Sequence, residues 1–207
     1  MPSLAVLSVF VPTFLFVSLT PGMCMTLAMV LGMTQGVKRA LWMMIGELLG
    51  VGLVAFAAGA GVAALMLKLP AMFAVFKWVG GAYLFYLGIQ MWRSRGRMAI
   101  PDDLSDVAPT ARKELAMQGF VTAVANPKGW AFFVALLPPF LDATRPFIGQ
   151  LLVLIVMILA IEFCALMLYA SGGKSLRHLL AKGGNVRLLN RVAGTLMLGV
   201  GLWLALG

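Results

Sequence analysis

Residues 4–33 read LAVLSVFVPTFLFVSLTPGMCMTLAMVLGM, a run that contains no charged side chain. A membrane-spanning helix needs about 20 consecutive apolar residues, so the run is long enough to cross a bilayer. Near its middle stands Leu19-Thr20-Pro21-Gly22. Proline removes a backbone donor and clashes with the carbonyl one turn earlier, and glycine relaxes the backbone further. The run therefore predicts a first membrane span that is broken near its middle.

The rest of the chain has the same apolar character. Of its 207 residues 62% are hydrophobic and 11% are charged, whereas a soluble domain is about 45–50% apolar and about 25% charged. Five further spans are predicted at about 41–67, 71–92, 115–140, 147–170 and 188–206.

The N-terminus lacks the basic start of a signal peptide, so we expect the first span to be retained. The prediction is an all-α integral membrane protein with one transmembrane domain over residues 1–207. Five spans with one re-entrant segment are the alternative, because the first span is broken.

The positive charges predict the orientation of these spans. The net charge is +9, and twelve of the 16 Lys and Arg residues fall in or beside alternate loops. These twelve are Lys38, Arg39, Arg93, Arg95, Arg97, Arg112, Lys113, Lys174, Arg177, Lys182, Arg187 and Arg191. Positive loops stay in the cytoplasm, so we expect a multi-pass protein of the bacterial inner membrane with both termini periplasmic. Because the positive residues alternate with apolar runs, nucleic acid is not the expected partner.

The fourth predicted span repeats features of the first. It contains Ala125-Asn126-Pro127-Lys128-Gly129, and in both spans a phenylalanine stands seven residues before the proline. The third span contains KWVG at residue 77 and the sixth contains RVAG at residue 191. We therefore predict two three-helix units, 1–92 and 115–207, inverted relative to each other and joined by a cytoplasmic loop, 93–114. Inverted repeats with paired broken helices are typical of secondary transporters.

The two breaks are the candidate substrate pathway. Half-helix ends present free amides to an anion and free carbonyls to a cation, which suits a zwitterionic amino acid. The pathway residues that we predict are Thr20, Pro21, Gly22, Asn126, Pro127 and Lys128.

Three charged residues, Glu47, Lys128 and Glu162, fall within the predicted spans. A charge in hydrocarbon is costly, so these side chains should face the bundle interior or water. One interpretation is a structural ion pair between Lys128 and a glutamate. The functional interpretation is that Glu47 or Glu162 couples protons to transport or binds an ammonium group, while Lys128 helps to hold a carboxylate. Tyr83 and Tyr86, one turn apart, are secondary candidates for which packing is the alternative role.

The motifs together resemble the lysine-exporter family, which includes threonine, homoserine and leucine exporters. The resemblance rests on Leu19-Thr20-Pro21-Gly22, on Asn126-Pro127-Lys128, on Gly80-Gly81-Ala82-Tyr83-Leu84 and on Gly36 with Arg39. It covers nearly the whole chain and implies proton-driven efflux of amino acids or related metabolites, with the proline motifs shaping the pathway. The chain departs from the family pattern at Met23, where a second proline is usual, and near Met25, where Asn is frequent. This loss of polarity favours a more apolar ligand.

Two other functions stay open as alternatives. A divalent-cation exporter is one, although two carboxylates and no histidine within the spans are a sparse ligand set. A membrane scaffold that transports nothing is the other, and it predicts that Pro21, Pro127, Glu47 and Glu162 tolerate substitution. The sequence contains no phosphate loop, paired-Cys metal set or nucleophile elbow, so neither an enzyme nor a cofactor is expected. A homodimer is compatible with the sequence.

Overall fold

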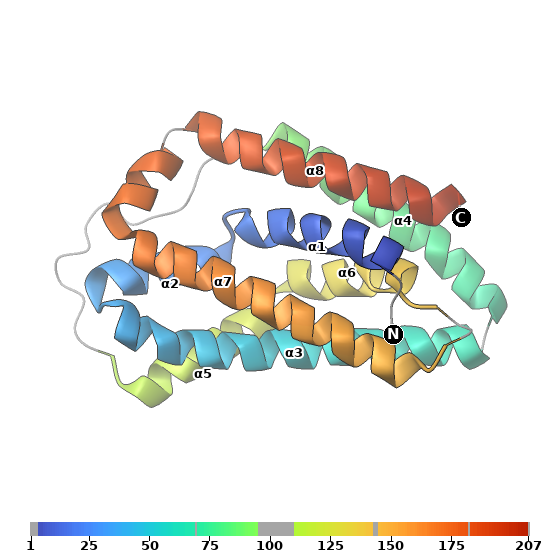
Figure 1. Cartoon of the computed structure of the whole chain (residues 1–207), viewed down its shortest axis with the longest axis horizontal. Coiled ribbons are helices and arrows are strands. Elements are labelled where there is room, and N and C mark those ends of the chain that lie inside the picture. The colour runs from blue at the N-terminus through green and yellow to red at the C-terminus, as the bar shows by residue number, and fades with distance from the viewer. Residues whose placement is uncertain (1–3, 69, 95–109, 143–144, 182, 207) are drawn as a thin grey trace.

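The computed structural model describes residues 4–68, 70–94, 110–142, 145–181 and 183–206. The side chains of some helical residues, Pro127 and Lys128 among them, and most of the predicted 93–114 loop lie outside the described part. Every described element is a helix, as predicted (Figure 1). They are α1 (Leu4–Leu19), α2 (Met23–Thr34), α3 (Val37–Lys68), α4 (Pro70–Arg93), α5 (Arg112–Val124), α6 (Pro127–Leu136), η1 (Pro138–Phe140), α7 (Phe147–Ala181) and α8 (Gly183–Leu206).

Both predicted breaks are present. The first span divides into α1 and α2, which meet at an angle of 56° across Thr20, Pro21 and Gly22. The fourth divides into α5 and α6 at Ala125 and Asn126. Among the described residues, Val37–Val62 and Phe147–Gly173 are long and apolar enough to cross a membrane by themselves, and the bent α1–α2 pair passes the same test as a unit. The full set of six spans stays a prediction.

The helix pairings remain the same when the two halves of the chain are exchanged. The broken helix α1–α2 packs on α7, and the broken helix α5–α6 packs on α3. The remaining helices pair with their own counterparts, α4 with α8 and α3 with α7. The first residues of α1 and the last residues of α8 lie at the same end of the bundle, opposite the turn between α2 and α3 (Figure 1). This pattern is what two related three-helix units would produce, and their inversion stays a prediction.

Glycines bring three helix pairs into backbone contact. A Cβ on Gly119 of α5 would lie 2.0 Å from the carbonyl oxygen of Met43 on α3, and one on Gly46 would lie 1.8 Å from that of Ala116. Gly32 approaches Ala170 in the same way where α2 crosses α7. Gly88 and Gly194 approach each other where α4 crosses α8. Apolar surface alone gives little association between helices in lipid, so these close contacts determine which helices pair.

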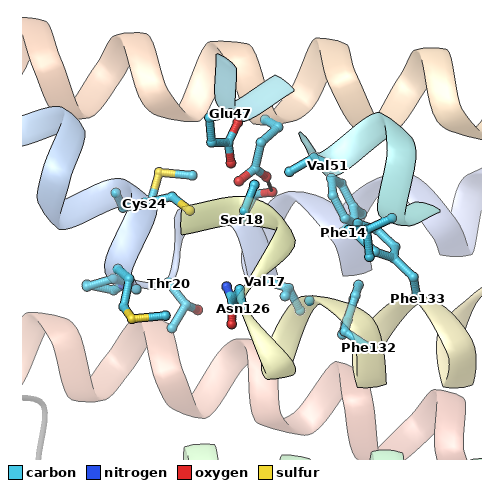
Figure 2. A pocket seen from close by; sticks show the side chains of 18 residues that line it. Phe14, Val17, Ser18, Thr20, Cys24, Glu47, Val51, Asn126, Phe132 and Phe133 are labelled. Atoms are coloured by element: carbon cyan, nitrogen blue, oxygen red, sulfur yellow. Dashed lines mark hydrogen bonds between the residues drawn. The ribbon is translucent and has the colours of Figure 1, made fainter. Parts of the chain in front are cut away.

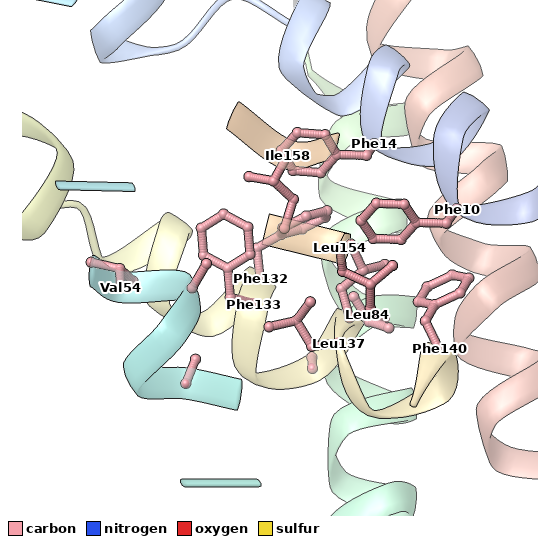
Figure 3. Packing of buried hydrophobic residues seen from close by; sticks show 14 of the residues in the cluster. Phe10, Phe14, Val54, Leu84, Phe132, Phe133, Leu137, Phe140, Leu154 and Ile158 are labelled. Carbon is pink, nitrogen blue, oxygen red and sulfur yellow. The ribbon is translucent and has the colours of Figure 1, made fainter. Parts of the chain in front are cut away.

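Two clusters of buried hydrophobic side chains lie on either side of the first break. One cluster joins Phe10 and Phe14 of α1 to Leu84, Phe140 and Leu154 (Figure 3). Within it, the rings of Phe10 and Phe140 meet edge to face with centroids 5.0 Å apart.

The second cluster contains the buried residues of α2 together with the C-terminal half of α7. On α3, by contrast, Ile45, Leu49 and Leu53 are about half exposed at the outer surface. A row of large apolar side chains on the outside suits contact with acyl chains rather than water.

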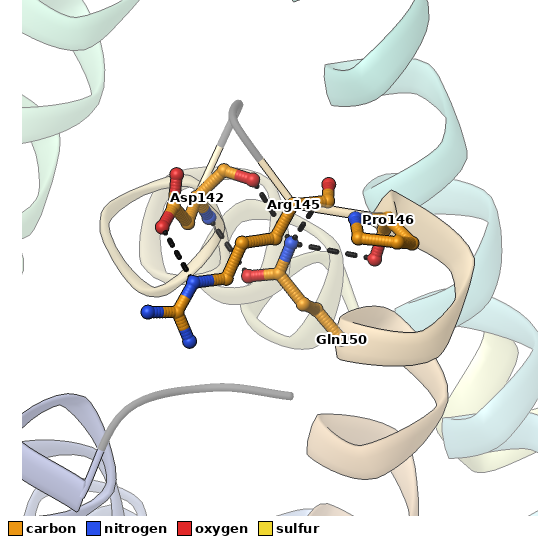
Figure 4. Close-up of polar contacts among 4 residues, drawn as sticks. All are labelled: Asp142, Arg145, Pro146 and Gln150. Atoms are coloured by element: carbon orange, nitrogen blue, oxygen red, sulfur yellow. Dashed lines mark hydrogen bonds and ion pairs between the residues drawn. The ribbon is translucent and has the colours of Figure 1, made fainter.

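A single buried amide holds the turn between η1 and α7. Gln150 is fully buried, and its side-chain oxygen accepts a hydrogen bond from the Asp142 N–H at 2.9 Å. Its amide nitrogen donates to the carbonyls of Asp142, Arg145 and Pro146 (Figure 4). The ion pair between Arg145 and Asp142 is solvent-exposed and contributes little. The amide therefore satisfies the backbone groups of a turn that belongs to no helix.

Candidate functional site

A cavity of about 460 Å³ lies where the two broken helices meet (Figure 2). The first break contributes Thr20, Pro21 and Gly22, and the second contributes Asn126 and Gly129. Helices α3 and α7 complete the wall with Glu47 and Glu162. Segments far apart in the sequence thus enclose one space, whose size is within the usual range for small-molecule sites.

Aromatic side chains satisfy carbonyls that the breaks leave without a helical partner. The hydroxyl of Tyr169, on α7, donates to the carbonyl of Leu19, the last residue of α1, at 2.8 Å. The indole N–H of Trp130 donates to the carbonyl of Val124, the last residue of α5, at 2.9 Å. A free carbonyl at membrane depth costs several kcal/mol, so these bonds stabilise the interrupted backbone.

Replacing Tyr169 by Phe is expected to lower the free energy of unfolding by about 1–3 kcal/mol, because the buried Leu19 carbonyl loses its donor. Thermal unfolding of the purified protein in detergent measures this loss. Tyr86→Phe is the matched control, since Tyr86 is 54% exposed and its hydroxyl bonds only to the exposed Gln90 among the contacts described. Equal melting temperatures for the two variants would contradict a capping role for Tyr169.

One side of the cavity is polar and contains both intramembrane carboxylates. Ser18, on α1, donates a hydrogen bond to Glu162, on α7. Glu47 is 1% exposed, and neither of its carboxylate oxygens has a hydrogen-bond partner among the described residues. Cys24 and Glu162 line the same cavity as Glu47. Two acidic groups thus share one buried space, in which adding or removing a single proton or cation changes the interaction energy strongly.

The other side of the cavity is aromatic. Phe14, Phe132 and Phe133 lie together there, with Val51 beside them (Figure 2). The ring centroids of Phe132 and Phe133 are 5.8 Å apart, and those of Phe14 and Phe132 are 6.0 Å apart. The cavity is therefore amphipathic, with acid groups on one side and rings on the other.

The structure brings most of the predicted site residues together. Thr20, Pro21, Gly22, Asn126, Glu47 and Glu162 line the cavity. The hydroxyl of Thr20 donates to the Phe16 carbonyl at 2.8 Å. Pro127 is the first residue of α6, but its side chain and that of Lys128 lie outside the described part, and with them the ion pair considered for Lys128.

The tyrosine pair lies elsewhere. Tyr86 is largely exposed, and Tyr83 packs against the first hydrophobic cluster, with neither among the cavity residues. Their rings are 6.3 Å apart, in keeping with their spacing of one turn.

Sequence reasoning did not single out Ser18, Phe132, Phe133, Trp130 or Tyr169 as site residues, and it gave Cys24 no part in a site. Ser18 and Cys24 flank the Thr20-Pro21-Gly22 break, and the aromatic residues Trp130, Phe132 and Phe133 follow the Pro127 break closely. Nearness to a break was therefore the signal that could have identified them. No such signal exists for Tyr169, which reaches the first break from a distant helix.

Comparisons with known proteins match the chain over most of its length. The LysE type translocator family matches residues 15–207. An uncharacterized membrane protein of Vibrio cholerae is 29% identical over 188 residues, which are 91% of this chain and 90% of that protein. A homoserine/homoserine lactone efflux protein of Salmonella typhimurium is 29% identical over 194 residues, which are 93% of this chain and 92% of that protein. A leucine efflux protein of Klebsiella pneumoniae is 27% identical over 192 residues, which are 92% of this chain and 90% of that protein. No solved structure matches significantly.

Proposed function

Because this chain belongs to the LysE family of translocators, a family of membrane transporters rather than enzymes, we propose that it exports a small amino acid or related metabolite. The exporter works by secondary active transport across the bacterial inner membrane, and protons entering the cell drive the substrate out. The names of the relatives, which are efflux proteins for homoserine and leucine, support an amino-acid substrate.

The observation that carries this proposal is the cavity at the two helix breaks. In secondary transporters, binding at broken helices lets the substrate contact half-helix ends, and rocking of one unit against the other changes the side from which it is reached. A scaffold would gain nothing from two interrupted spans, since each break leaves backbone groups that need special partners such as Tyr169 and Trp130.

Proton coupling is assigned to the two glutamates of the cavity, Glu47 and Glu162. An intramembrane carboxylate that lines a substrate space is the usual proton carrier of such transporters. Their shared location allows competition, because a bound proton and a bound ammonium group each neutralise the same pair of acids. Competition of this kind is what exchange of protons for substrate requires.

The test is transport by purified protein in proteoliposomes with an acidic lumen. Labelled leucine, homoserine, threonine and lysine are offered outside, with manganese as one divalent cation. Accumulation of an amino acid that stops with an uncoupler is the expected result. Movement of manganese alone would support the cation-exporter alternative. Failure of folded protein to move any of these solutes would contradict the proposal.

A further inference from the structure

The cavity has three chemically different parts, and their arrangement specifies a ligand more narrowly than the family does. The first part is Glu47, a fully buried acid whose two oxygens lack donors among the described residues. A buried carboxylate without donors is unfavourable by several kcal/mol, which a cationic ligand group with N–H donors would offset. Glu162 differs, because Ser18 already donates to it.

The second part is the start of α2, a helix of 12 residues. Thr26 is the first residue whose N–H bonds back along the helix, to the Gly22 carbonyl at 2.9 Å. The amides of Met23, Cys24 and Met25 precede it, and all three residues line the cavity. Free amides and the positive end of the helix dipole favour a carboxylate there. Cys24 and Glu47 line the same cavity, so the start of α2 and the acid face one shared space.

A cation site and an anion site side by side match the geometry of an α-amino acid, whose ammonium and carboxylate groups share one carbon. The two sites would bind both groups of one zwitterion. A ligand that lacked either group would leave Glu47 or the α2 amides without a partner.

The third part is apolar and receives whatever extends from the α-carbon. Val51 and Val54 follow Glu47 at four and seven residues, so they continue the same face of α3 into the cavity. Phe14, Phe132 and Phe133 line the space beside them (Figure 2). A hydroxyl or ammonium group at the end of a substrate side chain would lose its hydration against such a wall.

We propose that the cavity selects an amino acid with an apolar side chain, with its ammonium group on Glu47, its carboxylate on the first amides of α2 and its side chain against Val51 and the three phenylalanines. This assignment rests on the proposed function and deepens it. It distinguishes a leucine-like substrate from a homoserine-like one, a choice that the two kinds of relative leave open.

The first test measures binding to the full-length protein in nanodiscs by calorimetry. Leucine and its 2-hydroxy analogue, 2-hydroxy-4-methylpentanoate, differ only in the ammonium group. We expect the wild type to bind leucine about 10–100-fold more tightly than the hydroxy analogue, because the analogue cannot make the charge-assisted hydrogen bond to Glu47. Glu47→Gln should lose most of this preference. Glu114→Gln is the control, since Glu114 is an exposed acid at the start of α5 where Gln can also cap the helix. An unchanged preference in Glu47→Gln would overturn the ammonium assignment.

The second test concerns the side chain. Wild-type protein should bind leucine at least about tenfold more tightly than homoserine, since burying an unpaired hydroxyl costs about 1–3 kcal/mol in proteins and 1.4 kcal/mol is a factor of ten. Val51→Thr adds a hydroxyl at nearly constant shape and should narrow that ratio, whereas Val156→Thr, on the outer surface of α7, should not. Tighter binding of homoserine or lysine than of leucine would overturn the side-chain assignment and leave amino-acid export intact. Binding of no amino acid would overturn the proposed function itself.

Discussion

Replacing Glu162 by Gln is expected to abolish proton-driven accumulation of substrate while exchange of labelled for unlabelled substrate continues. Gln retains the shape of Glu and can still accept the Ser18 hydrogen bond, but it cannot take up a proton. With one proton exchanged per substrate, a pH difference of one unit supports a substrate gradient of about tenfold. Proteoliposomes with an acidic lumen should therefore concentrate substrate with the wild type and reach only equal concentrations with the variant.

Two controls make this result specific. Glu114→Gln changes an exposed acid outside the cavity and should accumulate substrate like the wild type. Exchange without a pH gradient shows that Glu162→Gln is folded and still binds. Undiminished accumulation by Glu162→Gln would remove Glu162 from the coupling mechanism and leave Glu47 as the carrier to test. Undiminished accumulation by the double variant with Glu47→Gln would contradict proton coupling through this cavity.

Replacing Gly119 by Leu should separate α3 from α5 and destabilise the protein by about 3 kcal/mol or more. A Cβ at this position would lie 2.0 Å from the Met43 carbonyl oxygen and 2.9 Å from the Glu47 nitrogen. Both atoms belong to the backbone of α3, so no side-chain rotation relieves the clash. Because the contact includes the backbone of Glu47, transport should be lost together with stability.

Thermal unfolding in detergent measures the first effect and transport in proteoliposomes the second. Gly149→Ala is the matched control, because nothing lies within 4 Å of a Cβ built there. Alanine in place of a helical glycine should leave stability unchanged or raise it by up to about 1 kcal/mol. A Gly119→Leu protein that melts with the wild type would mean that α3 and α5 do not approach as closely as described.

The sequence alone was sufficient for the fold class and for the positions of both breaks. An uncharged, mostly apolar run of thirty residues would expose much of its apolar surface to water in a soluble protein. A Pro-Gly or Asn-Pro pair within such a run interrupts the helix wherever the run lies. The predicted span 4–33 became α1 and α2, and the span 115–140 became α5, α6 and η1. These are local effects of backbone chemistry, and they depend on no distant residue.

Only the tertiary structure decided which residues share the cavity. The sequence placed Glu47 and Glu162 on separate helices with no reason to meet, and it offered no role for Ser18 or for Tyr169. Their meeting depends on how α1–α2 packs on α7 and α5–α6 on α3, which the close approaches at Gly32 and Gly119 fix. Helix pairing in lipid follows from the fit of whole surfaces, and the periodicity of one helix does not specify its partner. Proline, glycine and charge thus located the parts of the site, and packing of the helices assembled them.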